Sequence, residues 1–251
     1  TTGPTPTPYT PNLLNQYTAV GGTAVSYDPN GNLTSDGTRT YTFDSENRLL
    51  TASGPSGSAS YTYDPLGRRL TKTVNGSTTR FLYDGEDLIG ETDTAGTLLA
   101  QWVFGPGIDE PLRMTRGGLT HYYHADGLGS LVALTDNTGA LAESTTYDAF
   151  GQPSAASVLG NSYLFTGREY DAETGLYHSR ARAYDPRLGR FLQRDPVGYG
   201  PDVNVYRYVN NNPLRWLDPL GLEKGPPGSG RGGGGGAPGG PDSGQGDSGT
   251  G

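Results

Sequence analysis

The sequence predicts an all-β protein built from repeated antiparallel hairpins. Composition is the first reason, because the 251 residues include 41 Gly, 19 Pro and 17 Tyr but only one Met and no Cys. Such a mixture favours short strands joined by tight turns over long helices. The second reason is a repeat, in which an aromatic residue is followed by Asp at positions 27, 43, 63 and 83, and again at 147, 170 and 184. Periods close to 20 residues are typical of repeat arrays.

Each repeat carries the pattern of a hairpin. In "RTYTFDSENRLLTAS", Tyr41 and Phe43 are two positions apart and therefore share one face of a strand. Asp44 begins a turn, Asn47 ends it and Leu49 begins the return strand. We therefore expect hairpins with an aromatic inner face and with Thr, Ser and Arg side chains outside.

The following unit, "ASYTYDPLGRRLTKT", repeats this pattern with Tyr61 and Tyr63, a turn at Gly67 and Leu70 in the return strand. One hairpin cannot bury its apolar face alone, whereas stacked hairpins form a continuous sheet stabilised by nearest-neighbour contacts. The expected architecture is a spiralling antiparallel sheet.

Four segments are expected along the chain. Residues 1–18 form an extended Thr/Pro-rich segment, since Pro lacks the N–H donor that a sheet uses. The repeats follow at 19–165, and a further segment occupies 166–222. The remaining residues, 223–251, include 14 Gly and 4 Pro and no aromatic residue, so this tail is expected to be disordered.

Charge and composition argue against several functions. The net charge is −8 without a run of Lys or Arg, which argues against a nucleic-acid partner. No stretch approaches 18 apolar residues, so no membrane span is expected. The absence of Cys excludes disulfides and thiolate metal sites, and His121 and His124 lie on opposite faces of an expected strand. No cofactor and no metal are therefore predicted.

Four aspartates near the end of the dense part of the chain are candidates for chemistry: Asp185, Asp195, Asp202 and Asp218. Two of them share a local pattern, Asp195-Pro-Val-Gly-Tyr and Asp218-Pro-Leu-Gly-Leu, in which Pro and Gly make a sharp turn that aims the carboxylate. If the two turns meet, the carboxyl groups share a proton, so that one activates a water and the other polarises a carbonyl. This is peptide hydrolysis without Ser, Cys or metal. The alternative is that both aspartates only form turns.

Other polar residues are interpreted as structural. Asp87, Asp109 and Glu110 are expected to be exposed turn acids, because nothing in the sequence pairs them for glycosidase chemistry. The stretch "GPGIDEPL", residues 105–112, is expected to be a loop at a rim of the repeat sheet. His178 is expected to be structural or to lie near the aspartate pair.

These residues resemble a known family. The stretches "YDPNGNLTSDG", "FDSENRLLTASG" and "YDPLGRRLTKT" resemble the YD-repeat, or rearrangement-hotspot (Rhs), family. The stretch "TGREYDAETGLYHSRARAYDPRLGRFLQRDPVGYGPDVNVYRYVNNNPLRWLDPLGL" is similar to the core-associated domain of that family almost throughout. The resemblance covers roughly residues 19–222. It implies repeats wound into a hollow β-shell, a core-associated segment that closes one end, and a variable toxin beyond it. The C subunits of Tc toxins and the shells of teneurins are related.

The resemblance also implies roles for single residues. Asp195 and Asp218 match the paired catalytic aspartates of the Rhs family, and the cut is expected between Leu222 and Glu223. Arg182 matches an assisting Arg in the "R-x-Y-D-P" stretch, where it stabilises charge or tunes the pair. A small departure is Tyr at position 199, where the first motif often has Leu.

The expected function is that of the C-terminal part of a polymorphic-toxin shell, which encapsulates a C-terminal effector and releases it by aspartyl self-cleavage after Leu222. This is one intramolecular event, so the chain is an enzyme only in a narrow sense. Expected partners are its own C-terminal toxin or tail and the remaining repeats of the shell, together with secretion-system proteins and carbohydrate. The expected location is outside a bacterium, secreted or at its surface, although no signal peptide is visible. The alternative is a non-catalytic surface protein for adhesion or carbohydrate binding, which exposed rows of aromatic residues would favour.

Overall fold

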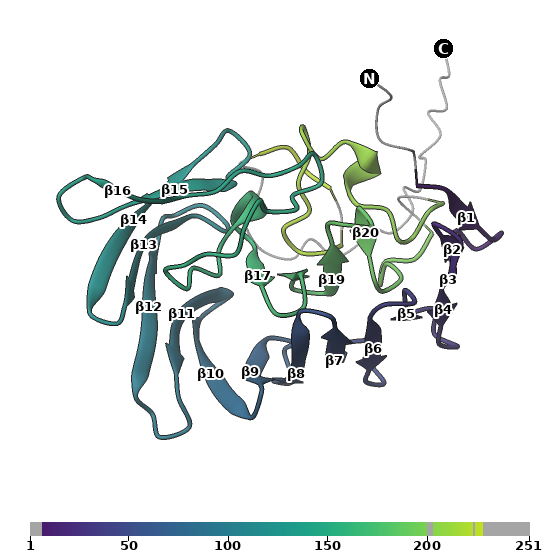
Figure 1. The fold of residues 1–251 in the computed structure, drawn as a ribbon, viewed down its shortest axis with the longest axis horizontal. Coiled ribbons are helices and arrows are strands. Elements are labelled where there is room, and N and C mark those ends of the chain that lie inside the picture. The colour runs from purple at the N-terminus through teal and green to yellow at the C-terminus, as the bar shows by residue number, and fades with distance from the viewer. Residues whose placement is uncertain (1–6, 200–202, 223, 228–251) are drawn as a thin grey trace, which may run out of the picture.

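The computed structural model describes residues 7–199, 203–222 and 224–227, and it confirms the all-β prediction (Figure 1). These residues form three antiparallel sheets and two short 3₁₀ helices, with no α-helix among them. Asp202 lies outside the described residues. The tail that was expected to be disordered also lies outside them, including its first residue, Glu223, apart from residues 224–227.

The largest sheet has 13 strands, which follow one another from β4 to β16 in chain order. Each strand therefore pairs with its sequence neighbours, as the hairpin repeats predict. The strands are β4 (Ser26–Tyr27), β5 (Leu33–Ser35), β6 (Thr40–Phe43), β7 (Leu49–Gly54), β8 (Gly57–Tyr63), β9 (Arg69–Val74), β10 (Ser77–Asp84), β11 (Asp87–Thr92), β12 (Leu98–Phe104), β13 (Pro111–Arg116), β14 (Leu119–Ala125), β15 (Leu131–Thr135) and β16 (Leu141–Ser144).

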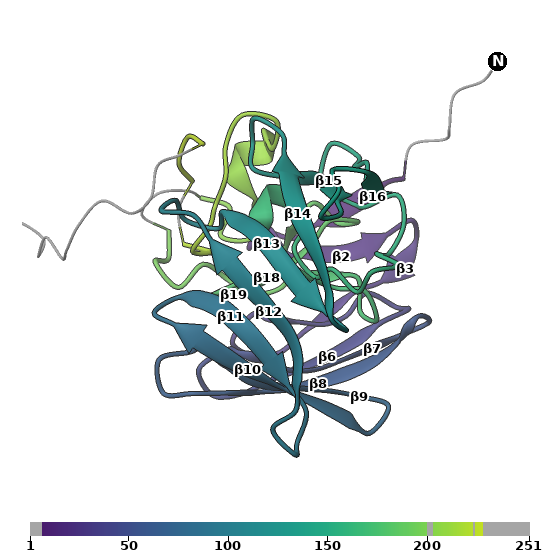
Figure 2. The same cartoon turned by 90° about the vertical axis from the view of Figure 1, so that its left-hand side faces the viewer.

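Two smaller sheets complete the fold. The first contains β1 (Tyr9–Pro11), β2 (Tyr17–Val20) and β3 (Thr23–Ala24), and the second contains β17 (Glu169–Asp171), β18 (Leu176–Ser179), β19 (Arg182–Asp185) and β20 (Arg190–Phe191). The 3₁₀ helices are η1 (Phe165–Gly167) and η2 (Val209–Asn211). Figure 1 shows β4–β16 as a curved wall with β17–β20 on its concave side, and Figure 2 shows the same wall from the side of β10–β14.

The turns between repeat strands are closed by aspartate, as the sequence predicts. Asp44 accepts hydrogen bonds at Oδ1 from the backbone N–H groups of Glu46 and Arg48, each at 2.9 Å. Asn47 adopts a positive φ of 64° and donates its N–H to the Asp44 carbonyl at 3.0 Å. Asn tolerates this left-handed conformation better than most residues, so the local sequence fixes where the chain reverses.

The wall has an aromatic inner face, and its outer face is largely polar at β6–β9 but exposes Leu82, Ile89, Val103 and Leu112 at β10–β13. Tyr41, Tyr61 and Trp102 are each at most 3% exposed. On the outer face, Thr42 and Thr51 join their hydroxyl groups at 2.7 Å across two strands, and the next hairpin repeats this pair. Inward-facing aromatic rows are what the shell interpretation requires.

The C-terminal segment fills the concave side of the wall. Leu176, Ala183 and Leu192 pack into one cluster with inward side chains of the wall. Tyr163 lies edge-on against Trp102 and Phe104, with ring centroids 5.5 Å apart in both pairs. Burial of these apolar surfaces is the main force that closes the wall around the segment.

Residues 9–11, within the segment expected to be extended, form a short strand. Residues 9–11 pair with 17–20 as strands β1 and β2, and the pairing register shifts between Thr10 and Pro11. Pro11 is the last residue of the edge strand β1, where the sheet does not need the N–H donor that proline lacks.

A difference from the sequence prediction concerns the return strand of one hairpin. Tyr63 pairs with Arg69, and Thr62 pairs with Thr71, so Leu70 is an extra residue in a bulge. Leu70 is 43% exposed, whereas Arg69 points inward and is 3% exposed. Arg69 rather than Leu70 therefore occupies the inner position that Leu49 has in the preceding hairpin.

Candidate functional site

The structure brings Asp195, Asp218 and Arg182 together. Asp195 follows β20, Asp218 follows η2, and Arg182 begins β19. One nitrogen of Arg182, Nη2, lies 3.1 Å from Oδ2 of Asp195 and 3.1 Å from Oδ2 of Asp218. Because both carboxylate oxygens contact Nη2 of Arg182, the distance between Oδ2 of Asp195 and Oδ2 of Asp218 is at most twice 3.1 Å.

The guanidinium group of Arg182 is buried and held on every side. Its carbon atom lies 3.7 Å from the centroid of the Phe191 ring, and Nη1 donates to the Val205 carbonyl at 3.3 Å. Burial lowers the pKa of Arg182 below its ordinary value, and the nearby charges of Asp218 and Asp195 oppose this effect. The site is therefore a desolvated group of opposite charges, in which electrostatic interactions are stronger than in water.

The turn that carries Asp218 is a variant of the repeat turn. Oδ1 of Asp218 accepts the N–H of Leu222 at 2.9 Å, just as Oδ1 of Asp64 accepts the N–H of Arg68 at 2.9 Å. In the repeat, the Arg68 side chain also binds Oδ2 of Asp64 at 2.8 Å. Leu222 has no such donor, and Oδ2 of Asp218 faces Arg182 instead.

The turn that carries Asp195 also lacks an arginine that binds the aspartate within the turn. Oδ1 of Asp195 accepts the N–H of Val197 at 2.9 Å, and Gly198 donates its N–H to the Asp195 carbonyl at 3.0 Å. The fourth residue after Asp195 is Tyr199 rather than Arg. In both turns, the position that Arg48 and Arg68 occupy after Asp44 and Asp64 holds a side chain without charge, as it also does in other repeat turns, such as that of Ala140 after Asp136.

The peptide before the expected cut is bound along its backbone by the β18–β19 turn. Three successive carbonyl oxygens each accept one hydrogen bond from three successive residues. The pairs are Arg180 Nη1 to Pro219 O at 2.5 Å, Ala181 N to Leu220 O at 3.2 Å, and Arg182 Nε to Gly221 O at 2.5 Å.

Gly221 allows this close approach. Its φ is +69°, and a Cβ atom at this position would collide with the carbonyl oxygen of Ser179. Only glycine combines this left-handed backbone with the absence of a side chain. The Gly221–Leu222 peptide is consequently held at both ends, at its carbonyl by Arg182 and at its N–H by Asp218.

A cavity of about 510 Å³ reaches the expected cleavage point. Leu222, Leu220 and Pro196 line it, together with residues of the repeat turns and of the segment around β17 and β18. Beyond Leu222 the chain returns past Leu217, which exchanges two backbone hydrogen bonds with Gly225 at 3.0 and 2.8 Å. The residue that contributes the amide of the expected scissile bond, at position 223, lies outside the described residues.

The sequence matches the teneurin YD-shell family over residues 5–214. The chain belongs to the teneurin YD-shell family. Its membership of the wider Rhs/YD-repeat family is thereby confirmed.

Relatives of this YD-shell chain include proteins named as nucleases and toxins. The tRNA3(Ser)-specific nuclease WapA of Bacillus spizizenii is 41% identical over 223 residues, which cover 84% of this chain and 10% of the relative. Double-stranded DNA deaminase toxin A of Burkholderia cenocepacia is 30% identical over 240 residues, covering 78% of this chain and 16% of that protein. The crystal structure of TcdB2-TccC3 has a TM-score of 0.63 at 23% identity, covering 78% of this chain and 11% of that one. The YD-shell chain thus spans about a tenth of the length of the first of these relatives.

Other candidate residues of the YD-shell chain lie apart from the aspartate pair. Asp185 is fully buried, where desolvation raises its pKa, and it contacts Arg187 at 2.5 Å. His121 is buried and His124 is exposed, so they face opposite sides of β14 as expected. Within the described part of the chain, no group of three or more His, Cys, Asp or Glu side chains is arranged to hold a metal, and no helix is long and apolar enough to cross a membrane.

Asp109 is the residue that sequence reasoning missed. It was expected to be an exposed turn acid, but it is only 9% exposed and contacts Arg168 at 2.5 Å and Arg180 at 2.8 Å. The signal was indirect, because a buried arginine such as Arg168 needs an acidic partner, and the sequence does not say which one.

Proposed function

We propose that this YD-shell segment cuts its own chain between Leu222 and Glu223 and thereby releases the polypeptide on the C-terminal side of the cut. One observation carries the proposal: Asp195 and Asp218 meet on a single nitrogen of buried Arg182, and Asp218 also binds the N–H of Leu222. The residue before the expected cut is therefore fixed beside two carboxyl groups.

The proposed reaction is acid–base hydrolysis by the two carboxyl groups. One carboxylate takes a proton from a water whose oxygen attacks the Leu222 carbonyl carbon, and the other carboxyl gives a proton to the departing nitrogen of Glu223. The products are a new carboxylate at Leu222 and a new amine at Glu223. Arg182 keeps the two acids near each other and offsets the negative charge that builds up during attack.

The backbone contacts support the reaction through orientation. The β18–β19 turn and Asp218 immobilise the Gly221–Leu222 peptide before reaction, so little orientational freedom remains to be lost. The cavity beside Leu222 and Pro196 offers space for the attacking water.

In this proposal the wall encloses an effector encoded beyond Leu222, and the cut separates the two. The names of the relatives support it, since they include a nuclease and a deaminase toxin from bacteria. We infer a secreted or surface location on the same basis.

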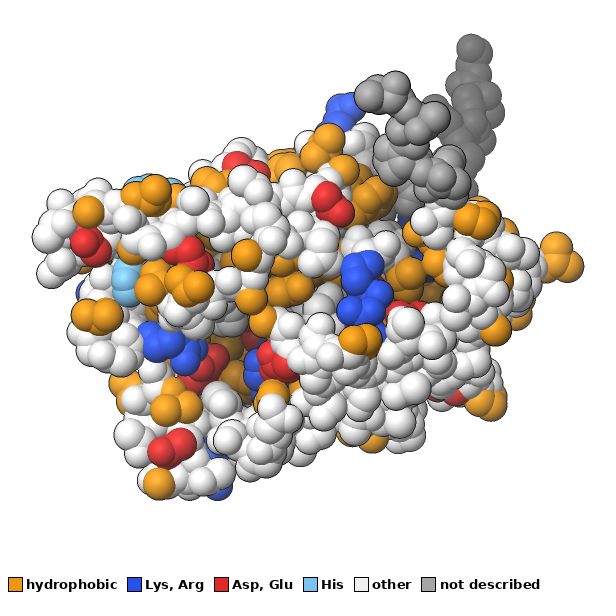
Figure 3. Space-filling view, in the orientation of Figure 1, with side chains coloured by type: hydrophobic (Ala, Val, Ile, Leu, Met, Phe, Trp, Pro, Cys, Tyr) orange, Lys and Arg blue, Asp and Glu red, His pale blue; other side chains and the backbone are white. Residues whose placement is uncertain are grey.

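Figure 3 shows acidic and basic side chains mixed on the displayed face, without a continuous basic area for nucleic acid. Secretion-system proteins and carbohydrate stay predicted partners.

The intact mass of the full 251-residue chain tests the proposal. We expect two species, one ending at Leu222 and one beginning at Glu223, and a single full-length species for Asp195→Asn and for Asp218→Asn. Asparagine keeps the oxygen that closes each turn but cannot exchange the proton, so these variants separate chemistry from folding. Asp136→Asn, in the β15–β16 turn, is the matched control and should be cut normally.

Two results would contradict self-cleavage. A folded wild-type chain that stays at full mass would leave the aspartates as turn formers, an interpretation supported by the likeness of the Asp218 and Asp64 turns. A break at the Asp195–Pro196 or Asp218–Pro219 bond would indicate acid lability of Asp-Pro instead.

A further inference from the structure

The loop between β12 and β13 reaches across to the turn that carries Asp218. Asp109 in this loop receives two hydrogen bonds from Arg180, from Nη2 to Oδ1 at 2.8 Å and from Nη1 to Oδ2 at 3.2 Å. Nη1 of Arg180 also donates to the Pro219 carbonyl at 2.5 Å. Two hydrogen bonds in series therefore connect the repeat wall to the residue directly after Asp218.

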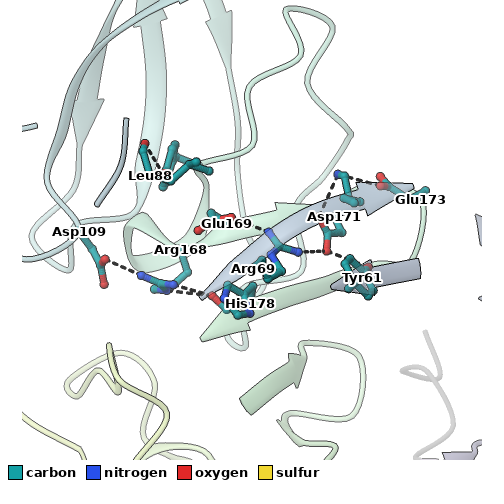
Figure 4. Close-up of polar contacts among 11 residues, drawn as sticks. Tyr61, Arg69, Leu88, Asp109, Arg168, Glu169, Asp171, Glu173 and His178 are labelled. Atoms are coloured by element: carbon teal, nitrogen blue, oxygen red, sulfur yellow. Dashed lines mark hydrogen bonds and ion pairs between the residues drawn. The ribbon is translucent and has the colours of Figure 1, made fainter. Parts of the chain in front are cut away.

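Asp109 itself has little freedom to move. Nη1 of Arg168 contacts its Oδ1 at 2.5 Å, and the other nitrogens of Arg168 donate to the His178 carbonyl at 3.1 and 2.7 Å (Figure 4). The backbone of Asp109 also presses on Gly167, where any Cβ atom would collide with the Asp109 carbonyl oxygen. The loop is thus locked against the segment around β17 and β18.

The two hydrogen bonds to Asp109 fix the orientation of the planar guanidinium group of Arg180. A free arginine side chain has many rotamers, whereas contact with both oxygens of a carboxylate sets the position and direction of its nitrogens. The other acidic contact of Arg180 is Glu86, whose side chain is 61% exposed and 3.6 Å away. Asp109 is therefore the dominant partner that directs Arg180 toward Pro219.

We propose that Asp109 is a positioning residue for cleavage after Leu222, because it holds Arg180 where that side chain fixes the Asp218 turn. This inference rests on the proposed function and deepens it. Its consequence is conditional cleavage: the site is complete only when the β12–β13 loop has docked, so the chain is cut only after the wall has closed around the C-terminal segment.

Cleavage kinetics during refolding of the full chain are the first test. Asp109→Asn keeps the shape and the acceptor oxygen but removes the charge, and we expect cleavage to slow roughly tenfold or more. Arg180→Gln should slow it similarly. The double variant should be no slower than Arg180→Gln alone, because Asp109 acts through Arg180. Asp136→Asn should retain the wild-type rate.

Amide hydrogen exchange gives a readout that does not need cleavage. In an Asp195→Asn background, the Leu222 amide reports the Asp218 turn directly, since it donates to Oδ1 of Asp218. Adding Asp109→Asn should speed exchange at Leu222 roughly tenfold and leave the β9–β10 pair Thr71 and Arg80 unchanged. If the wild-type chain never cuts itself, this measurement still decides whether Asp109 positions the turn.

Three outcomes would overturn the inference. Unchanged exchange at Leu222 in Asp109→Asn would do so, as would cleavage of Asp109→Asn at the wild-type rate. Equal acceleration at Leu222 and Thr71 would show a general loss of stability rather than positioning. If Asp109→Asn does not fold, Arg180→Gln, which leaves the Asp109–Arg168 ion pair in place, is judged by the same measurements.

Discussion

Arg69 on β9 and Asp171 on β17 are 102 positions apart in the sequence, yet Nη1 of Arg69 lies 2.6 Å from Oδ2 of Asp171 (Figure 4). Both side chains are at most 5% exposed. Nη2 of Arg69 contacts Glu169 at 2.5 Å, and Lys72 contacts the second oxygen of Asp171 at 3.0 Å. Burial alone would raise the pKa of Asp171, but Arg69 and Lys72 outweigh it and hold the pKa well below its ordinary value. This ionic cluster joins the wall to the segment that it encloses.

Arg69→Met is expected to lower the free energy of unfolding by about 3–5 kcal/mol, because it leaves two buried carboxylates without their main partner. Urea denaturation measures the loss. The exposed Arg80 on β10 provides the control, and Arg80→Met should change stability by less than about 0.5 kcal/mol. Adding Asp171→Asn and Glu169→Gln to Arg69→Met should recover part of the loss. Equal effects of Arg69→Met and Arg80→Met would show that the cluster contributes nothing.

His178 makes stability depend on pH. Burial lowers its pKa well below the ordinary value, and the charges of Arg69 and Arg168 add to this effect. In the unfolded chain His178 binds a proton below about pH 6.5, whereas in the folded chain it stays neutral, so acidification favours unfolding. We expect the free energy of unfolding to fall by about 1 kcal/mol between about pH 7.5 and 5.5 from this residue. His178→Gln should remove that part of the slope and His124→Gln, at an exposed position, should not. Parallel pH profiles for wild type and His178→Gln would contradict the assignment.

Gly67 and Gly221 occupy the same position in two equivalent turns, which makes them a matched pair for substitution. Both have positive φ, +84° and +69°, but a Cβ atom meets nothing within 4 Å at Gly67 and meets Ser179 at Gly221. Gly67→Ala should therefore cost only the backbone strain of about 1–2 kcal/mol. Gly221→Ala should also displace the 218–222 turn and slow cleavage at least tenfold. Mass spectrometry over a refolding time course compares them, and similar cleavage rates in the two variants would argue against a tightly fitted turn.

Local patterns allowed the hairpins to be predicted, because Asp44 and Asn47 close a turn through bonds within five residues. The inward residue of the next hairpin was not predictable in this way. The preceding hairpin has the same bulge, at Leu50, and carries Leu49 at the inner position, so the bulge does not explain the charge. A buried Arg69 is stable only because Asp171 and Glu169 approach from a distant segment.

In the candidate site, too, some residues could be predicted from the sequence and others could not. Asp195 and Asp218 stand out through their shared Asp-Pro-x-Gly pattern, and the resemblance to the Rhs family supplied Arg182. Asp109 has no local signal, since its role depends on a loop that packs against arginines from other parts of the chain.

Arg182→Lys separates the two roles that remain open for Arg182, a counter-charge and an orienting fork. Lysine keeps the positive charge, but its single ammonium cannot reach Gly221 O, Val205 O and both aspartates as the planar guanidinium does. If orientation matters, cleavage should slow at least tenfold when it is measured below the thermal midpoint of the variant, which should fall because the buried hydrogen bonds to Gly221 and Val205 are lost. The exposed Arg113 on β13 serves as the control, and Arg113→Lys should leave both quantities unchanged. If Arg182→Lys is cut at the wild-type rate, Arg182 acts only through its charge, and the position of the two carboxylates must be set by their own turns.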